Sequence, residues 1–298
     1  MIEGQESVAW EQWTALARTA EEAGIEALFR SDHYFGIARE GNGGSLDAWM
    51  SLAGLAATTE RIRLGTLVSP VTFRPASVLA KEVVTADHIS GGRVELGIGA
   101  GWFEAEHVLY GLPFRTAGER VALLAEQLET ILRQWTEDGR IQPKPVQQPH
   151  PPVIVGGAGK RGTVGPAVRW ANEYNTTKAT VQECRTIRET LDRACEAAGR
   201  DPATLPLSMM CTCIVGTDDA DLRGHVSRYA EIYRPGASVE EVLRDLSPND
   251  LIGTVDVVAD RLREFEAVGV SRAMLRNLVH EDLEQTDHIG RELAPAVG

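Results

Sequence analysis

The segment Ser31-Asp32-His33 holds the residue types best suited to acid–base chemistry in this chain. It follows an apolar run that ends at Phe29. An imidazole at the end of a strand can donate a hydrogen bond or move a proton near pH 7, so His33 is the candidate catalytic residue. In the structural alternative, Asp32 only bonds its own turn and His33 packs against its neighbours.

Glycines dominate the segment Gly156-Gly157-Ala158-Gly159-Lys160-Arg161-Gly162, which leads from a second apolar run towards a helix. Backbone N–H groups at the start of a helix bind anions, and Lys160 adds a positive charge. The segment therefore predicts a phosphate site. It is not a P-loop, because Arg161 stands where that motif needs Ser or Thr. The alternative is that the glycines only allow a tight turn.

A third segment, Gly97-Ile98-Gly99-Ala100-Gly101-Trp102, ends a strand predicted at residues 94–98 and leads into a turn. Glycines at such a turn let a flat ring approach the backbone closely, and this is the function we expect. A dinucleotide fingerprint fits less well, because Trp102 occupies the position of its third glycine. A fourth segment, Gly65 to Pro70, by itself indicates only that a buried strand stops before a proline.

Short apolar runs alternate with helical patterns along the chain, which is typical of parallel βαβ units. Seven strands are predicted, at residues 27–29, 63–68, 94–98, 153–155, 173–176, 207–215 and 273–275. Helices are predicted at residues 10–23, 46–59, 104–110, 116–135, 180–198, 220–233, 254–268 and 283–293, with another from Pro75. The pattern predicts an α/β fold, a single (β/α)₈ TIM barrel over residues 1–298, whose functional loops share one rim.

The first barrel strand should precede the helix at residues 10–23, where only Met1 and Ile2 stand before Glu3 and Gly4. Either a two-residue stub completes the barrel, or the natural start lies upstream of Met1. Without a first strand, the barrel would stay open between its second and eighth strands and expose their unpaired backbone groups. We therefore favour a truncated first strand with an upstream start. Residues 143–152 contain five prolines and predict an extended, non-helical connector.

The charge balance argues against nucleic acid as a partner. Thirty Lys and Arg against 43 Asp and Glu give a net charge of −13, which repels a phosphate backbone. No apolar run reaches the roughly 20 residues that span a bilayer, and the N-terminus has no secretory leader pattern. We therefore expect a cytoplasmic location and no membrane partner.

Neither the cysteines nor the histidines show a metal-binding pattern. The chain has no CxxC pair, no HExxH motif and no zinc-finger spacing. No metal site is therefore predicted. We expect reduced structural thiols at Cys184, Cys195, Cys211 and Cys213.

Several segments in this order resemble the luciferase-like monooxygenase family, and especially its deazaflavin-dependent branch. The segments that carry the resemblance are Leu28 to His33, Thr59 to Thr66, Ile89 to Arg93, Leu96 to Trp102, Gly118 to Arg120, Pro152 to Gly157 and Gly253-Thr254. The resemblance implies a (β/α)₈ barrel that holds a flavin-type ring in its mouth, with coenzyme F420 as the cofactor and FMN as the alternative.

The resemblance also implies roles for individual residues and an assembly. Asp32 and His33 are implied to lie beside the ring, and Ala100, Gly101 and Trp102 along its other side. A bulge formed by Leu67, Val68 and Ser69 is implied to press on the face of the ring. The implied phosphate contacts are Gly156, Gly157, Ala158, Gly159 and Lys160. A cis peptide bond is implied between Leu67 and Val68. A homodimer is expected by analogy with the family.

The resemblance and the loops together predict an oxidoreductase that transfers a hydride between coenzyme F420 and a small organic substrate, with His33 managing the proton. One alternative is an FMN-dependent monooxygenase of a two-component system. Another is a flavin- or deazaflavin-binding protein without turnover. Trp102 stands where related sugar-phosphate dehydrogenases have an acidic residue, so their substrate is not expected here.

Overall fold

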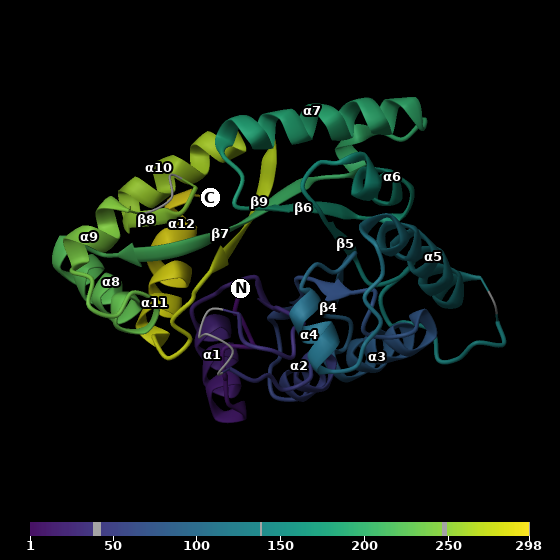
Figure 1. The fold of residues 1–298 in the computed structure, drawn as a ribbon, viewed down its shortest axis with the longest axis horizontal. Coiled ribbons are helices and arrows are strands. Elements are labelled where there is room, and N and C mark those ends of the chain that lie inside the picture. The colour runs from purple at the N-terminus through teal and green to yellow at the C-terminus, as the bar shows by residue number, and fades with distance from the viewer. Residues whose placement is uncertain (38–42, 138, 246–248, 298) are drawn as a thin grey trace.

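Strands and helices alternate along the chain in the computed structural model, which describes residues 1–37, 43–137, 139–245 and 249–297 (Figure 1). The strands are β1 Ala27–Arg30, β2 Arg63–Thr66, β3 Ser69–Pro70, β4 Val94–Gly99, β5 Val153–Gly156, β6 Glu173–Thr177, β7 Leu207–Gly216, β8 Leu251–Thr254 and β9 Val270–Arg276. The helices are α1 Trp10–Glu22, α2 Ala48–Ala56, α3 Ala76–Ser90, α4 Glu104–Leu109, α5 Ala117–Thr136, α6 Arg161–Trp170, α7 Val181–Ala197, α8 Asp219–Tyr233, α9 Val239–Arg244, α10 Val255–Glu266, α11 Leu283–His288 and α12 Ala294–Val297. Strands stand at all seven predicted places.

Side-chain caps determine where several helices begin. Thr116 and Glu119 form a capping box at the start of α5. The carboxylate of Asp47 accepts the backbone N–H of Met50 at 2.9 Å and caps α2. Beyond its cap, α5 buries an apolar stripe against the barrel, formed by Leu124, Leu128, Ile131 and Trp135.

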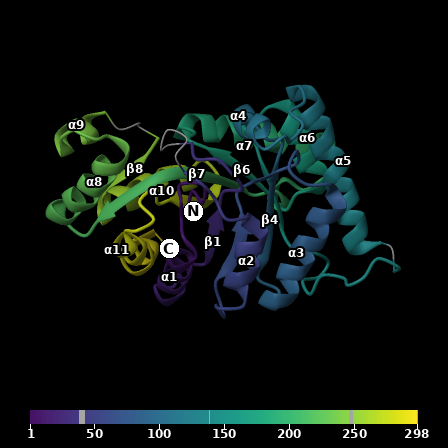
Figure 2. The ribbon, with the colours of Figure 1, turned by 60° about the horizontal axis from the view of Figure 1, so that its bottom comes forward.

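All strand ladders are parallel, and the sheet curves into a nearly closed TIM-barrel-like wall. The order is β1-β2-β4-β5-β6-β7, with β3 beside β4 and β9 beside β7. The prediction missed β8, which pairs with residues 213–216 of β7, whereas β9 pairs with residues 207–212. The carboxyl-terminal part of β7 therefore extends beyond β9, and Figure 2 shows β8, α8 and α9 beside it at one side of the molecule.

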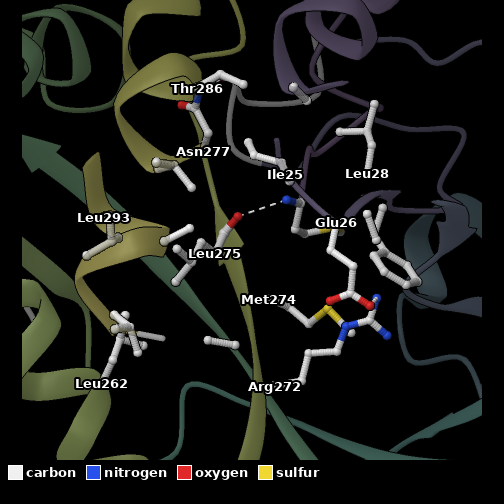
Figure 3. A pocket seen from close by; sticks show the side chains of 18 of the residues that line it. Ile25, Glu26, Leu28, Leu262, Arg272, Met274, Leu275, Asn277, Thr286 and Leu293 are labelled. Carbon is white, nitrogen blue, oxygen red and sulfur yellow. Dashed lines mark hydrogen bonds and ion pairs between the residues drawn. The ribbon is translucent and has the colours of Figure 1, made fainter. Parts of the chain in front are cut away.

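Met1 and Ile2 bridge the seam between β1 and β9, where the first barrel strand is expected. Ile2 forms parallel bridges with Arg30 on one side and Asn277 on the other. The nitrogen of Met1 donates to the carbonyl of Leu275 at 2.8 Å (Figure 3). A two-residue stub thus fills the carboxyl end of the seam, while the predicted upstream start stays a prediction.

A cavity of about 540 Å³ lies next to Met1 and Ile2, between β1, β9 and the helices that cover these two strands. Apolar side chains such as Leu28, Leu262 and Leu293 line it (Figure 3). The predicted site residues are not among its lining residues in the described chain. This cavity is therefore separate from the predicted cofactor site.

The inside of the barrel is layered. At the amino ends of the strands, the carboxylate of the buried Glu95 pairs with Arg63 at 2.5 Å and with Arg272 at 2.9 Å. Above this charged floor lies an apolar cluster of Phe29, Leu67, Ile154 and Met274. A much larger apolar core packs between the sheet and the helices. The barrel interior is therefore filled, and its carboxyl end is the place left for a ligand.

All four cysteines are free and buried, as predicted. Burial raises the pKa of the Cys211 thiol to about 12, so this group stays protonated and unreactive near neutral pH. Among the described helices, we find none with both the length and the apolar character needed to cross a membrane.

Candidate active site at the barrel mouth

His33 and Glu106 form a hydrogen-bonded pair at the carboxyl ends of the strands. Nδ1 of His33, which follows β1, lies 2.7 Å from a carboxylate oxygen of Glu106 in α4. The other carboxylate oxygen accepts the backbone N–H of Tyr34 at 3.1 Å. Glu106 is buried, whereas His33 keeps 14% of its side chain exposed. The carboxylate therefore favours a proton on Nδ1 and leaves Nε2 for a ligand.

The surroundings of His33 favour its protonated form. Burial alone would lower the pKa of His33, but the hydrogen bond and the negative charge of Glu106 outweigh burial. The pKa of His33 is therefore raised above its usual value. A group of this kind can carry a proton at neutral pH and donate it to a substrate atom.

Asp32 lies beside His33 in a buried ionic network. Its carboxylate is 2.7 Å from the guanidinium of Arg74 and accepts the hydroxyl of Ser69 at 2.7 Å. Arg74 also pairs with Asp47 at 2.5 Å. These contacts hold the turn that carries His33. Direct contact of Asp32 and Ser69 with a cofactor stays a prediction.

Val68 packs between glycines of neighbouring strands. The peptide bond between Leu67 and Val68 is cis, as the family resemblance implies. A Cβ atom on Gly99 would lie 2.7 Å from a Val68 methyl group, and one on Gly156 would lie 3.0 Å away. Glycine is required at Gly99 because a larger residue would displace Val68. Gly156 thus has a packing role besides its predicted phosphate contact.

Aromatic side chains border His33. The Trp102 ring centroid is 5.8 Å from that of His33, edge to face, and 5.2 Å from that of Phe103, stacked. Trp102 remains 62% exposed. Gly101 precedes it with φ +78°, a conformation that favours glycine. An exposed indole beside a glycine turn offers a flat surface to a planar ligand.

The loop between β5 and α6 presents backbone N–H groups at its tip. The N–H groups of Gly157 and Gly159 are already used, by the carbonyl of Asn175 and the hydroxyl of Tyr174, each at 2.9 Å. Ala158 and Lys160 are exposed. In the described chain, the hydrogen bonds leave the N–H groups of Arg161 and Gly162 for another acceptor. The start of α6 therefore offers N–H donors to an anion at Arg161 and Gly162, whereas phosphate contacts at Gly156 to Lys160 stay a prediction.

Sequence analysis missed three side chains of this region: Phe103, Glu106 and His107. Nε2 of the buried His107 lies 2.6 Å from the hydroxyl of Thr72, which ties α4 to the loop after β3. This tie helps to hold Glu106 where it meets His33. The sequence offered one signal for them, because Glu106 and His107 are adjacent in the helix that follows the glycine-rich turn.

The comparison with known families identifies the chain. The model of the luciferase-like monooxygenase family matches residues 2–272. The protein belongs to this family. All the predicted site residues of this luciferase-like protein, from Asp32 to Lys160, lie within the matched range.

Relatives of this luciferase-like protein are named for two different cofactors. An uncharacterized protein of Mycobacterium tuberculosis is 37% identical over 235 residues, which cover 73% of this chain and 77% of its own. An FMNH₂-dependent dimethylsulfone monooxygenase of Pseudomonas putida is 26% identical over 82% of this chain and 76% of its own. An F420-dependent glucose-6-phosphate dehydrogenase of Amycolatopsis mediterranei is 37% identical over 122 residues, 40% of this chain and 36% of its own.

Solved structures confirm the barrel fold. The monooxygenase RslO1 from Streptomyces bottropensis superposes with a TM-score of 0.80 at 23% identity, covering 97% of this chain and 94% of its own. An F420-dependent secondary alcohol dehydrogenase superposes with a TM-score of 0.78 at 19% identity, covering 100% and 99%. The luciferase-like chain shares its whole architecture with both.

Proposed function

We propose that this luciferase-like protein transfers a hydride between coenzyme F420 and a small organic substrate at the barrel mouth. The observation that carries the proposal is the His33–Glu106 pair, joined at 2.7 Å next to the exposed Trp102. The glucose-6-phosphate dehydrogenase of Amycolatopsis mediterranei supports F420 over FMN, because it is 37% identical over the part that it matches.

The residues at the mouth fit a planar cofactor with a phosphate tail. Val68 and the glycine turn at Ala100 and Gly101 would contact the ring, with Trp102 beside it. The N–H groups of Arg161 and Gly162 at the start of α6 would donate hydrogen bonds to the phosphate, and the exposed Lys160 would neutralise part of its charge.

His33 would manage the proton that accompanies hydride transfer. F420 supplies the hydride chemistry when it is bound. Nε2 of His33 would protonate the substrate oxygen or nitrogen that gains negative charge. Glu106 would hold the imidazole in position and stabilise its charged form before the proton leaves.

A parallel titration of the purified full chain with F420 and with FMN tests the cofactor. We expect a Kd for F420 at least about 10-fold lower, equivalent to roughly 1.4 kcal/mol. His33→Ala should keep F420 binding but lower hydride exchange with a panel of alcohols, aldehydes and imines by roughly 100-fold. His88→Ala, at an exposed histidine of α3, is the matched control. Weaker binding of F420 than of FMN, or unchanged exchange in His33→Ala, would contradict the proposal.

An FMN-dependent monooxygenase is the second candidate. The dimethylsulfone monooxygenase of Pseudomonas putida favours it, because that match extends over 82% of this chain. In this case the same titration would give tighter FMN binding. Oxygenation of an organic substrate would then require O₂ and reduced FMN from a separate reductase, with one oxygen atom entering the product and the other leaving as water.

A further inference from the structure

Two histidines and an aspartate converge between α8 and α11, which lie side by side in both views (Figures 1 and 2). Oδ1 of Asp221 is 3.4 Å from Nε2 of His225, and Oδ2 is 3.4 Å from Nδ1 of His288. One ligand atom from each of the three residues can be chosen so that all three lie within 4.8 Å of one another. Only 1% of the His225 side chain is exposed.

The two ring nitrogens lack hydrogen-bond partners. Nε2 of His225 and Nδ1 of His288 are buried and unsatisfied within the described chain. A buried polar atom without a partner costs free energy, so both nitrogens would gain from a ligand. Bonds of about 2.0–2.1 Å to a tetrahedral metal ion separate neighbouring ligand atoms by roughly 3.3 Å, so ligand atoms that all lie within 4.8 Å can close around one ion with a small side-chain movement.

A second layer of contacts orients His225. Its Nδ1 is 2.6 Å from the carboxylate of Asp282, which favours a proton on Nδ1 and leaves the lone pair of Nε2 directed at Asp221. Metal-ligating histidines commonly have such a carboxylate partner. The hydroxyl and the N–H of Thr217 both donate to Asp221, at 3.0 and 2.8 Å, and fix its orientation.

An alternative group of His225, Asp282 and Glu284 is a poorer cation site. The guanidinium of Arg228 lies 2.9 Å from Asp282, 3.5 Å from Glu284 and 3.0 Å from Nδ1 of His225. The guanidinium therefore stands among the ligand atoms of this group and not on the Nε2 side of His225 that faces Asp221. Its positive charge already satisfies both carboxylates. A metal ion at this position would be repelled.

We propose that Asp221, His225 and His288 bind one divalent transition-metal ion, Zn²⁺ in particular, with water completing the coordination. Two imidazoles and one carboxylate suit Zn²⁺, whereas Ca²⁺ and Mg²⁺ prefer oxygen ligands throughout. Asp221 and His288 are 23% and 15% exposed, so an ion can enter. The ion joins α8 to α11, and its role is to stabilise this side of the barrel.

The test uses the full chain without a histidine tag, stripped with a chelator and titrated with ZnCl₂ by calorimetry. We expect one ion per chain. The Tm should rise by roughly 5 °C at a free-ion concentration about 100 times the Kd. His288→Ala and Asp221→Asn should each weaken binding at least about 100-fold, because each removes a ligand. A Co²⁺-loaded sample should show visible absorption typical of tetrahedral coordination.

Two variants serve as matched controls. Asp219→Asn changes an exposed carboxylate two residues from Asp221, and Glu284→Gln removes a carboxylate of the alternative group. Both should bind Zn²⁺ like the unchanged chain. Binding that is only millimolar, or that persists in His288→Ala, would mark an adventitious ion and overturn the proposal. Weakened binding in Glu284→Gln would place the ion on the alternative group and overturn it equally.

Discussion

Glu106 decides which protonation state His33 adopts. Without a partner, burial would favour the neutral imidazole and lower its pKa. The Glu106 carboxylate reverses this effect, because it is buried and lies within hydrogen-bond distance of Nδ1. The proposed acid function of His33 therefore depends on a residue that sequence analysis did not select.

Replacing Glu106 by Gln should lower the pKa of His33, since the negative charge is lost while burial remains. The alkaline limb of the pH–rate profile, where His33 loses its proton, should move to lower pH with it, and turnover at pH 7 should fall roughly 10- to 100-fold. An NMR titration of the His33 imidazole measures the pKa directly. Glu104→Gln, at an exposed position of the same helix, should leave both quantities unchanged. An unaltered His33 pKa in Glu106→Gln would show that the carboxylate does not control the proton.

At the scale of elements, the mouth is shaped by close packing between the bulge after β2 and the ends of β4 and β5. Val68 occupies the space that side chains at Gly99 and Gly156 would need. This interpretation gives the glycines a steric function that does not depend on a bound cofactor.

Gly99→Ala should displace Val68 and destabilise the protein by roughly 1–3 kcal/mol, because the new Cβ would lie 2.7 Å from a Val68 methyl group. Cofactor affinity should fall as well. Val68→Ala combined with Gly99→Ala should recover part of the stability, since the clashing methyl group is gone. Urea unfolding of the two single variants and the double variant measures the coupling. Strictly additive losses would argue against this contact.

At the scale of the whole molecule, the charged floor links opposite sides of the barrel. Glu95 of β4 pairs with Arg272 of β9 and Arg63 of β2. The net effect of these guanidinium groups is to hold the pKa of Glu95 below its usual value, although burial opposes them. The stability that Glu95 contributes is therefore full above its unfolded pKa and is lost as the pH falls through its folded pKa.

Glu95→Gln should lower the free energy of unfolding by roughly 3 kcal/mol at pH 7, because two guanidinium groups lose their buried partner. The difference from the unchanged chain should shrink as the pH falls below about 4.5, where Glu95 of the unfolded chain binds a proton, and should vanish below the lower folded-state pKa. Denaturant unfolding at pH 7 and pH 4 checks both parts. Glu129→Gln, which affects an exposed ion pair, should change stability by less than about 1 kcal/mol. If Glu95→Gln lowered the free energy of unfolding equally at both pH values, the ion pairs of Glu95 would not be the cause of the loss.

Two other whole-molecule expectations remain predictions. A homodimer was expected by analogy with the family, and light scattering of the purified chain measures its mass in solution. The cytoplasmic location likewise follows only from the sequence. Neither affects the chemistry proposed at the barrel mouth.

Local patterns in the sequence determined the parallel barrel and the loops of its rim. Alternating apolar runs and helical periods are short-range signals, so they predicted the seven strand positions correctly. The same signals placed His33, Trp102 and the Gly156–Lys160 loop at carboxyl ends of strands, because parallel strands share one functional edge. The family motifs also predicted the cis bond between Leu67 and Val68.

Only the tertiary structure decided which side chains meet. His33 and Glu106 are 73 residues apart, and His225 and Asp282 are 57 apart, so each contact depends on how whole helices pack. Two ligands of the proposed metal site, Asp221 and His225, are four residues apart on α8, but His288 comes from α11 and joins them only through helix packing. The pairing of β8 with the far end of β7, and the bridging of the seam by Ile2, were fixed by backbone hydrogen bonds between distant segments. Spacing along one chain does not encode such contacts, because they arise only after the barrel has closed.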